Sequence, residues 1–376
     1  MTPAPELKKR LLSLDVFRGI TVAAMILVNN PGDWRYIYAP LEHSEWNGCT
    51  PTDLIFPFFL FIVGVSIVYA LSGKKVDASN HSKVLLSVFK RAAILFGLGL
   101  LLSLFPFFDF SVVRIPGVLT RIAIVYLITA ILFIKFNEKV LFRLFIGLLL
   151  IYWLVMTLIP VPGIGLPNLE PETNLGAWLD RTIFTEAHLW KPSKTWDPEG
   201  LLSTLPAVAT GLFGILIGLT LKSKQRTDEN KVAWMFTYGL IAALAGLVLD
   251  LVFPINKSLW TSSFVLYTGG LASMALGLCY WLIDVKGFTK FTKPFVIYGV
   301  NAITVYFASG IIARSMTLIY VPLNGKDVTL KGWFYEQFFT PYFSPYNASL
   351  AGAITFVLIW LLILWIMYRK NIIIKV

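Results

Sequence analysis

The sequence contains ten separate stretches of roughly 20 mostly apolar residues, and this feature limits the possible folds more than any other. A transmembrane α-helix needs about 20 such residues to cross the hydrocarbon layer of a bilayer. Within that layer every backbone polar group must be hydrogen-bonded inside the protein, which leaves only helices or closed barrels. We therefore expect an all-α, polytopic membrane bundle of about ten helices, with residues 1–376 forming one domain. The expected spans are 14–30, 52–72, 84–105, 117–134, 139–159, 201–221, 231–253, 260–283, 294–319 and 349–368.

The composition supports a membrane protein and excludes several other classes. Hydrophobic residues make up 57% of the chain and charged residues only 14%, against about 25% charged residues in a typical soluble domain. Disordered and collagen-like chains are excluded. The net charge of +11 is typical of basic cytoplasmic loops and does not indicate a nucleic-acid partner. Cys49 and Cys279 are expected near opposite faces, so we predict no disulfide between them.

The distribution of positive charge predicts the orientation of the bundle. If the N-terminus is cytoplasmic, most of the 32 Lys and Arg residues fall at inner ends, including Lys8, Lys9, Arg10 and the connection 222–231. By the positive-inside rule, both termini are then cytoplasmic. No small-residue cleavage site follows the first basic cluster, so we expect no cleavable signal peptide.

The connections on the opposite, outer face are long and rich in Trp, Pro, Asn and acidic residues. The largest are 30–51, 160–200 and 320–348. Long loops of this kind at a membrane face are more often functional sites than spacers. Loops that merely cap the bundle remain the alternative.

Charged and strongly polar residues within the expected spans require partners, because they cost several kcal/mol in lipid when unpaired. Asp15 and Arg18 are three residues apart, so a helix would place them on one face for an ion pair. Arg121 needs an anionic partner, either a structural carboxylate or a bound phosphate. Arg314 is a further candidate for pairing, and Asn301 is expected to hydrogen-bond between helices.

Histidine occurs only three times, at His43, His81 and His188. His43 lies in the outer loop 30–51 between Glu42 and Glu45, with Asp53 ten residues later. Imidazole titrates near neutral pH, so it suits proton transfer and can also act as a nucleophile. We expect His43 to be the stronger catalytic candidate, His188 the weaker one and His81 a loop residue.

Other common reaction centres find no support in the sequence. The three histidines have no paired spacing of the HExxH type, so we predict no metal site. A GxSxG elbow and a GxxxxGK[ST] loop are also missing from the sequence, which argues against a serine hydrolase and a nucleotide hydrolase.

A longer set of motifs resembles the heparan-α-glucosaminide N-acetyltransferase family of membrane acyltransferases, including its shorter bacterial relatives. The most specific segment is HSEWNGCTPTDLIFPFFLFIVG at 43–64, whereas SLDVFRG at 13–19 is shared more loosely with other membrane acyltransferases. The remaining motifs follow in family order over almost the whole chain: VNN at 28–30, VRIPGVLTR at 113–121, VPG at 161–163, DR at 180–181, AHL at 187–189, DPEG at 197–200, PINKSLW at 254–260, DVKG at 284–287 and GVN at 299–301.

The resemblance implies acetyl transfer from cytoplasmic acetyl-CoA to the free amine of a glucosamine-type sugar on the far side of the membrane. The family's active histidine falls on His43, three residues before Trp46-Asn47-Gly48, and its acetyl-proximal asparagine falls on Asn29. The resemblance also suggests an inner-membrane location in a bacterial-type cell, contact with membrane lipid and a homodimer. The further residues that we expect to bind substrate or donor are Asn30, Trp46, Asn47, Arg114, Arg121, His188, Lys257 and Asn301.

These residues suit acyl transfer by either of two routes. An attacking amine must be neutral, so His43 could act as its base during direct transfer, or could carry the acetyl group first in a ping-pong route. Asn29 or a backbone N–H could stabilise the oxyanion, and Glu42 or Asp53 could hold the tautomer of the ring.

An amino-sugar transporter is the alternative. In that case Asp15, Arg18, Arg121 and Arg314 would line a pathway through the membrane. The two functions differ in their need for His43, because transport does not require one outer-loop histidine.

Overall fold

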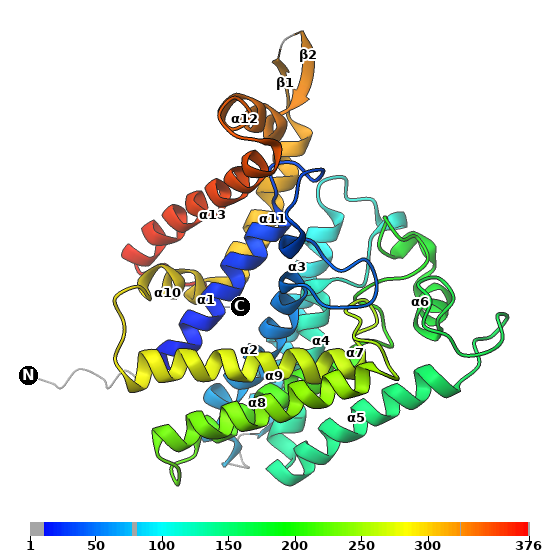
Figure 1. Ribbon diagram of the computed structural model, residues 1–376, viewed down its shortest axis with the longest axis vertical. Helices are drawn as coiled ribbons and strands as arrows, with labels where there is room; N and C mark the ends of the chain where they lie inside the picture. Colours follow the sequence, from blue (N-terminus) through cyan, green and yellow to red (C-terminus); the bar gives the residue numbers. More distant parts are fainter. Residues whose placement is uncertain (1–10, 77–80, 324, 375–376) are drawn as a thin grey trace, which may run out of the picture.

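A computed structural model describes residues 11–76, 81–323 and 325–374 and shows a bundle of helices with one small hairpin (Figure 1). Lys8, Lys9 and Arg10, which entered the charge prediction, lie outside these residues. The helices are α1 (Leu12–Asn29), α2 (Ile55–Lys75), α3 (His81–Leu104), α4 (Val118–Lys135), α5 (Glu138–Leu158), α6 (Leu175–Phe184), α7 (Thr204–Lys222), α8 (Asp228–Asp250), α9 (Ser262–Tyr280), α10 (Lys293–Val300), α11 (Ala302–Leu318), α12 (Leu330–Phe338) and α13 (Pro345–Arg369).

The predicted helical membrane bundle is confirmed. Within the described ranges, nine helices are long and apolar enough to cross a membrane, and a bent pair raises the number to ten. That pair is α10 and α11, which meet at an angle of 80°. The sequence predicted one continuous span over 294–319, and this part of the prediction is wrong. Asn301 leaves helical geometry between the two segments (φ −116°, ψ 34°).

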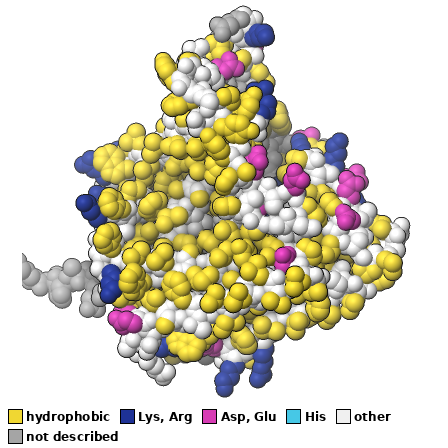
Figure 2. Space-filling view, in the orientation of Figure 1, with side chains coloured by type: hydrophobic (Ala, Val, Ile, Leu, Met, Phe, Trp, Pro, Cys, Tyr) yellow, Lys and Arg dark blue, Asp and Glu magenta, His cyan; other side chains and the backbone are white. Residues whose placement is uncertain are grey.

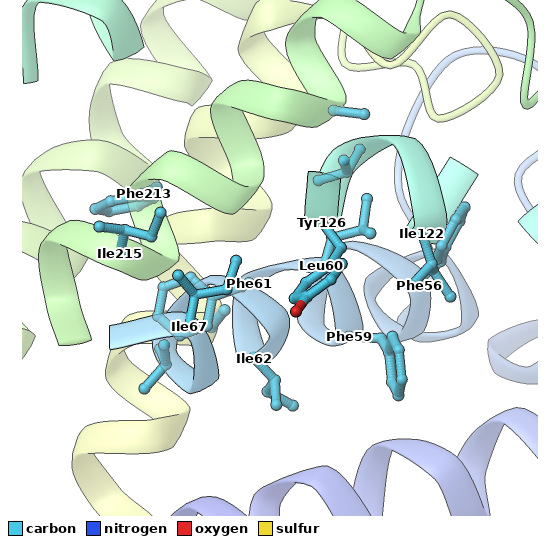
Figure 3. Close-up of a cluster of buried hydrophobic side chains, with 14 of the residues drawn as sticks. Phe56, Phe59, Leu60, Phe61, Ile62, Ile67, Ile122, Tyr126, Phe213 and Ile215 are labelled. Atoms are coloured by element: carbon cyan, nitrogen blue, oxygen red, sulfur yellow. The ribbon is translucent and has the colours of Figure 1, made fainter. Parts of the chain in front are cut away.

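The centre of the bundle is the contact between α2 and α7. In the most apolar part of each helix, 67% of the residues of α2 and 78% of those of α7 are buried, against 17% for α13. The backbones approach closely because Gly64 lies against the Gly211 carbonyl, where a Cβ would come within 2.0 Å of the oxygen. Figure 3 shows Phe61 and Ile67 of α2 on the side of Phe213 and Ile215, which belong to α7. This contact holds the outer end of α2 in place.

The loops predicted to lie on the outer face do meet at one end of the bundle. The Gly48 amide donates to the Ile255 carbonyl (2.7 Å), and the Ile115 amide donates to the His188 carbonyl (3.0 Å). The Trp46 indole N–H donates to the carbonyl of Leu169 (3.0 Å). Segments 30–51, 113–117, 160–200 and 250–261 therefore form one connected layer. This layer contains α6 and short turns in addition to irregular loop.

The expected inner ends also come together at the opposite end of the bundle. Lys75, at the end of α2, donates to the Phe136 carbonyl just after α4 (2.5 Å). The Ser13 amide at the start of α1 donates to Asp284 beyond α9 (3.0 Å). Figure 2 shows Lys and Arg side chains along the left and lower edges and also on the hairpin and at the upper right, where most acidic side chains of this face lie near α6. The orientation that we predicted from charge stays a prediction.

The third outer loop, 320–348, contains structure that the sequence did not predict. Strands β1 (Tyr320–Leu323) and β2 (Lys326–Thr329) form an antiparallel hairpin, with Tyr320 paired to Thr329 and Leu323 to Lys326. Helix α12 follows and leads into α13 through a short turn. Figure 1 shows the hairpin and α12 projecting above the ends of α11 and α13.

Candidate active site

The candidate site is built on a direct contact between His43 and Asp53 in the loop before α2. The Nδ1 atom of His43 lies 2.7 Å from Oδ1 of Asp53. The Asp53 side chain is fully buried, whereas 51% of the His43 side chain is exposed. Because a buried carboxylate accepts hydrogen bonds, the ring proton is held on Nδ1. The other ring nitrogen, Nε2, is then left with its lone pair.

The second oxygen of Asp53 organises the loop that carries His43. Its Oδ2 accepts hydrogen bonds from the Ser44 amide (3.1 Å), the Thr50 amide (3.0 Å) and the Thr50 hydroxyl. The Thr50 hydroxyl also lies 2.6 Å from the carbonyl of Glu42. Of the two acids expected to hold the ring, Asp53 makes the contact and Glu42 contributes only its backbone. The carboxylate of Asp53 thus holds the loop 42–53 together through its hydrogen bonds.

Lys257 reaches the histidine from the loop between α8 and α9. Its Nζ lies 3.0 Å from Nδ1 and 3.1 Å from Nε2 of His43, and 3.7 Å from Oδ1 of Asp53. Asn256 fixes this approach by donating from Nδ2 to Oδ1 of Asn47 (3.1 Å). Gly48, whose amide donates to the Ile255 carbonyl, also connects the two loops. Its φ of +104° suits glycine rather than a residue with a side chain.

Burial changes the charge balance of this lysine. Loss of solvent lowers the pKa of Lys257, and the carboxylates of Asp53 and Glu199 only partly oppose this effect. A neutral amine is therefore easier to form here than on the surface. The amine lies beside the imidazole and can donate a hydrogen bond or accept a proton at that position.

A cluster of buried charges lies behind the site. Arg114 binds Asp197 through two contacts (2.8 and 2.6 Å) and Glu199 through a third (2.5 Å). Burial would raise the pKa of Glu199, but Arg114, Arg121 and Lys257 outweigh it and lower that pKa. At Asp197 the effect of burial exceeds the effect of Arg114, so the pKa of Asp197 is raised. Glu199 thus places a negative charge behind Lys257.

Arg121 lies one helical turn into α4, fully buried against Trp260. Its guanidinium carbon is 5.2 Å from the indole centroid. One Nη donates to the Gly200 carbonyl (2.9 Å) and to the hydroxyl of Ser203. The anionic partner that we predicted makes no direct contact among the described residues. The remaining nitrogens, Nε and Nη1, have no hydrogen-bond partner there.

Two of the other predicted residues, Trp46 and His188, are framework positions in the structure. Trp46 packs edge-to-face on Trp196, with ring centroids 5.1 Å apart. His188 places Nδ1 2.7 Å from the carbonyl of Val113 and so anchors the segment before Arg114. Neither contacts His43 among the described interactions.

The two asparagines that end α1 differ in environment. Asn29 is the last residue of the helix and is exposed, whereas Asn30 is buried and donates to the Ile26 carbonyl (2.8 Å). Within the described residues, Asn29 forms no hydrogen bond to His43 or Asp53. Its expected part in the site therefore stays a prediction.

The predicted intramembrane charges Asp15, Arg18 and Arg314 have hydrogen-bond partners on their own helix or on neighbouring segments. Arg18 binds Asp15 (2.9 Å) as expected and also reaches Ser66 of α2 (2.9 Å). Arg314 donates to the backbone carbonyls of Leu102 and Phe105 instead of to a carboxylate.

The predicted hydrogen bonding of Asn301 is present, although its partner is the C-terminal segment. Its side chain binds the Ile372 carbonyl (3.2 Å) and the Ile374 amide (3.0 Å). These contacts hold residues 372–374 beside the break between α10 and α11.

A cavity of about 320 Å³ lies on the inner side of the bundle and follows α2 from Phe59 to Leu71. The twelve helical steps between these residues cover about 18 Å. Arg18, Ser66 and Arg91 provide its polar groups. Figure 3 shows Phe59 and Ile62, two of its lining residues, on the side of α2 away from Phe213. The upper end of the cavity lies six residues from Asp53.

Sequence reasoning missed three residues of the outer network. Asp197 and Glu199 occur in the DPEG motif, and Asn256 precedes Lys257 in PINKSLW, but none was assigned a role. Asn256 follows the apolar run LVFPI, and Asp197 and Glu199 lie in a long outer loop, so their signal was acidic or amide side chains in loops already expected to be functional. No group of three or more His, Cys, Asp or Glu in the described segments is arranged to hold a metal.

The fold and the outer site together define a polytopic helical membrane protein with a histidine–carboxylate pair at one face. The family model described as "Heparan-alpha-glucosaminide N-acetyltransferase, catalytic" matches residues 10–247, which include His43, Asp53, Arg114 and the DPEG loop. The chain belongs to this family, and the resemblance inferred from the motifs is confirmed.

Two relatives extend the match beyond that region. The human heparan-alpha-glucosaminide N-acetyltransferase is 30% identical over 98% of this chain and 60% of its own length. The mouse protein of the same name is 29% identical, with the same coverage of both chains. This chain therefore spans about three fifths of the length of these relatives.

Proposed function

We propose that this protein is a transmembrane acetyltransferase that moves an acetyl group from acetyl-CoA to the amine of a glucosamine-type sugar. The observation that carries the proposal is the 2.7 Å contact between His43 and the buried Asp53. It leaves Nε2 of a half-exposed ring ready to accept a proton at the outer face. Family membership supports the same reaction class.

In direct transfer, the neutral amine attacks the thioester carbonyl carbon while Nε2 of His43 takes the amine proton. The C–S bond then breaks, and the imidazolium returns a proton to the departing thiolate. Asp53 stabilises the imidazolium through Nδ1–H and holds the ring in place. General acid–base catalysis of this kind contributes about 10²–10⁴-fold.

In the ping-pong route, Nε2 itself attacks the thioester carbonyl carbon, the C–S bond breaks and the CoA thiolate leaves. The sugar amine then attacks the acetyl group on His43, the bond to Nε2 breaks, and Nε2 takes the amine proton. Both routes form a negatively charged carbonyl oxygen. Lys257 lies within 3.1 Å of the ring and can donate a hydrogen bond to that oxygen. Asn29 is the second candidate donor, from the end of α1.

The inner cavity is our proposed donor site. CoA carries phosphates that require cations, and Arg18 and Arg91 lie among the cavity's lining residues. The apolar wall along α2 suits the less polar arm of the donor. Because the cavity follows α2 toward Asp53, a donor bound from the cytoplasmic side would point its thioester at the outer site.

The acceptor, sidedness and assembly belong to the same proposal. Exposed Glu42 and Glu45 flank His43 and would attract a cationic amino sugar to the outer face. We propose a location in the inner membrane of a bacterial-type cell and a homodimer with bound membrane lipid. These features rest on charge polarity and on the family.

Purified protein with labelled acetyl-CoA and glucosamine tests the reaction directly. We expect labelled N-acetylglucosamine from the wild type, a loss of at least about 10²-fold with His43→Ala, and unchanged turnover with His81→Ala. His81 is the matched control because it lies at the opposite end, where its Nε2 is 2.9 Å from the Lys75 carbonyl. Failure to acetylate several amino sugars, together with glucosamine uptake into liposomes, would replace the enzyme with the transporter.

Acid quenching of enzyme with labelled acetyl-CoA alone separates the two routes. Label bound to wild-type protein and missing from His43→Ala, and released on addition of glucosamine, indicates ping-pong transfer. Product formation without labelled protein indicates direct transfer.

A further inference from the structure

A second hollow, which His43 does not line, lies between α11, α12 and α13. Its volume is about 520 Å³. The walls are almost entirely apolar and aromatic, and several of the side chains remain exposed, including Ile312, Phe334, Phe338 and Ile359. Figure 2 shows hydrophobic side chains across this part of the surface, around α12 and along α13. We refer to this hollow as the α12–α13 groove.

The length of the groove matches one leaflet of a bilayer. Along α13 its lining extends from Gly352 to Ile363, which is about 16 Å of helix. A hydrocarbon core of about 30 Å gives each leaflet about 15 Å of acyl chain. Water in such a groove would lack hydrogen-bond partners, so an apolar chain is the occupant that fits its walls.

The charged and amide side chains of the lining, Lys331 and Asn30, lie at the outer end of the groove, and Thr355 adds one hydroxyl farther along α13. Gly32 and Gly352 approach each other there, next to Tyr335 of α12 and Phe339 just after it, and Asn30 also belongs to the lining. Lys331, one turn before Tyr335, is the charged residue of the lining. The groove therefore has a cationic outer end and an apolar floor.

Lys331 has no hydrogen-bond or ion-pair partner among the described residues. Its nearest acid, Asp33, is already held by Arg35 through a 2.6 Å contact. Burial lowers the pKa of Lys331, and Asp33 opposes this effect. Because Asp33 and Arg35 cancel, the outer end retains one positive charge that an anion would neutralise.

We propose that the α12–α13 groove binds one acyl chain of an anionic phospholipid from the outer leaflet, with the lipid phosphate on Lys331. Three observations support this occupant over a second copy of the chain: the length of one leaflet, the polarity at one end and the unneutralised charge. The proposal is independent of the acetyltransferase reaction. It concerns a site separate from the residues around His43.

The test uses delipidated wild-type protein in detergent, titrated with phosphatidylglycerol whose acyl chains carry bromine, which quenches nearby tryptophan. Trp360 lines the groove, so the quenching that Trp360→Phe removes reports on this site alone. We expect saturable quenching, and about fivefold weaker binding with Lys331→Gln, since a basic residue near a lipid surface contributes about that factor. Ala313→Phe, which fills the wall, should abolish the signal.

Controls separate the headgroup from the chain. Lys326→Gln, an exposed lysine of the hairpin, should leave the titration unchanged, and brominated phosphatidylcholine should bind more weakly than phosphatidylglycerol. Inorganic phosphate should not displace the lipid at equal concentration. Equal binding of both lipids, displacement by phosphate, or quenching that survives Ala313→Phe would overturn the proposal. Dimers without lipid adducts in native mass spectrometry would assign the groove to a second copy instead.

Discussion

The two ends of α2 are built differently, although one helix joins them. At the outer end, the carboxylate of Asp53 has four hydrogen-bonding contacts, to His43, Ser44 and Thr50. Toward its inner end, α2 borders a cavity of about 320 Å³ that follows the helix from Phe59 to Leu71 and has two arginines in its lining. One end holds its reactive groups rigidly, whereas the other leaves space.

This difference suits a reaction that draws its two substrates from opposite sides. Chemistry depends on groups held within a fraction of an ångström, which packing and hydrogen bonds provide. Donor binding depends on space and charge, which a cavity provides. Changes at the outer end should therefore lower turnover, and changes at the inner end should weaken donor binding.

The largest expected effect is at the outer end. In Asp53→Asn, the backbone donors Ser44 and Thr50 require the amide oxygen, so the amide nitrogen faces His43. The imidazole proton then moves to Nε2, which can no longer act as a base. We expect turnover to fall about 10²-fold with little change in the KM for acetyl-CoA. Asp327→Asn, in the exposed hairpin, is the matched control, and equal turnover in both variants would contradict the proposed role.

A change at the inner end should have the opposite kinetic signature. Ala70 is exposed and lines the cavity, so Ala70→Trp would occupy donor space without disturbing the packed core. We expect the KM for acetyl-CoA to rise about tenfold with turnover at saturation nearly unchanged. Ala93→Trp places the same side chain on α3 outside the cavity lining. If both variants behave alike, the cavity is not the donor site.

Arg91 gives a smaller effect of the same kind. Its guanidinium lies 5.1 Å from the Tyr126 ring centroid and borders the cavity. An exposed charge contributes at most about 1 kcal/mol, so Arg91→Gln should raise the KM for acetyl-CoA about two- to fivefold. Salt should reduce the difference, because it screens exposed charges. A loss of turnover instead of donor affinity would contradict this assignment.

The smallest effect concerns stability and lies at the outer end. Burial, aided by the charge of Asp197, raises the pKa of Asp180 to about 7. The folded protein then binds this proton more tightly than the unfolded chain, so Asp180 should add stability as the pH falls from 8 to 5. Melting curves at both pH values should show a smaller gain for Asp180→Asn than for the wild type. Equal gains would show that folding does not raise the pKa of Asp180.

The fold was largely predictable, because lipid allows so few structures for a 20-residue apolar stretch. The break at Asn301 was not, since the residues 293–300 and 302–318 are both apolar and helical in pattern. The hairpin 320–329 was also missed, because it lies outside the membrane, where hydropathy carries little information.

The site was predictable only in part. His43 and Asp53 stand ten residues apart in one loop, so their contact could be anticipated. Lys257 is 214 residues from His43, and the hydrogen bonds of Asn256 and Gly48 hold the two loops together. The sequence pattern alone does not predict a contact between residues so far apart in the chain. The resemblance to the family was the only guide to Lys257.

Transfer across the membrane is the central claim, and liposomes test it most directly. Protein is reconstituted with glucosamine trapped inside and labelled acetyl-CoA added only outside. We predict labelled N-acetylglucosamine inside the liposomes, none with His43→Ala, and no acetyl-CoA in the lumen. Product that forms only when donor and acceptor share one side would contradict the account.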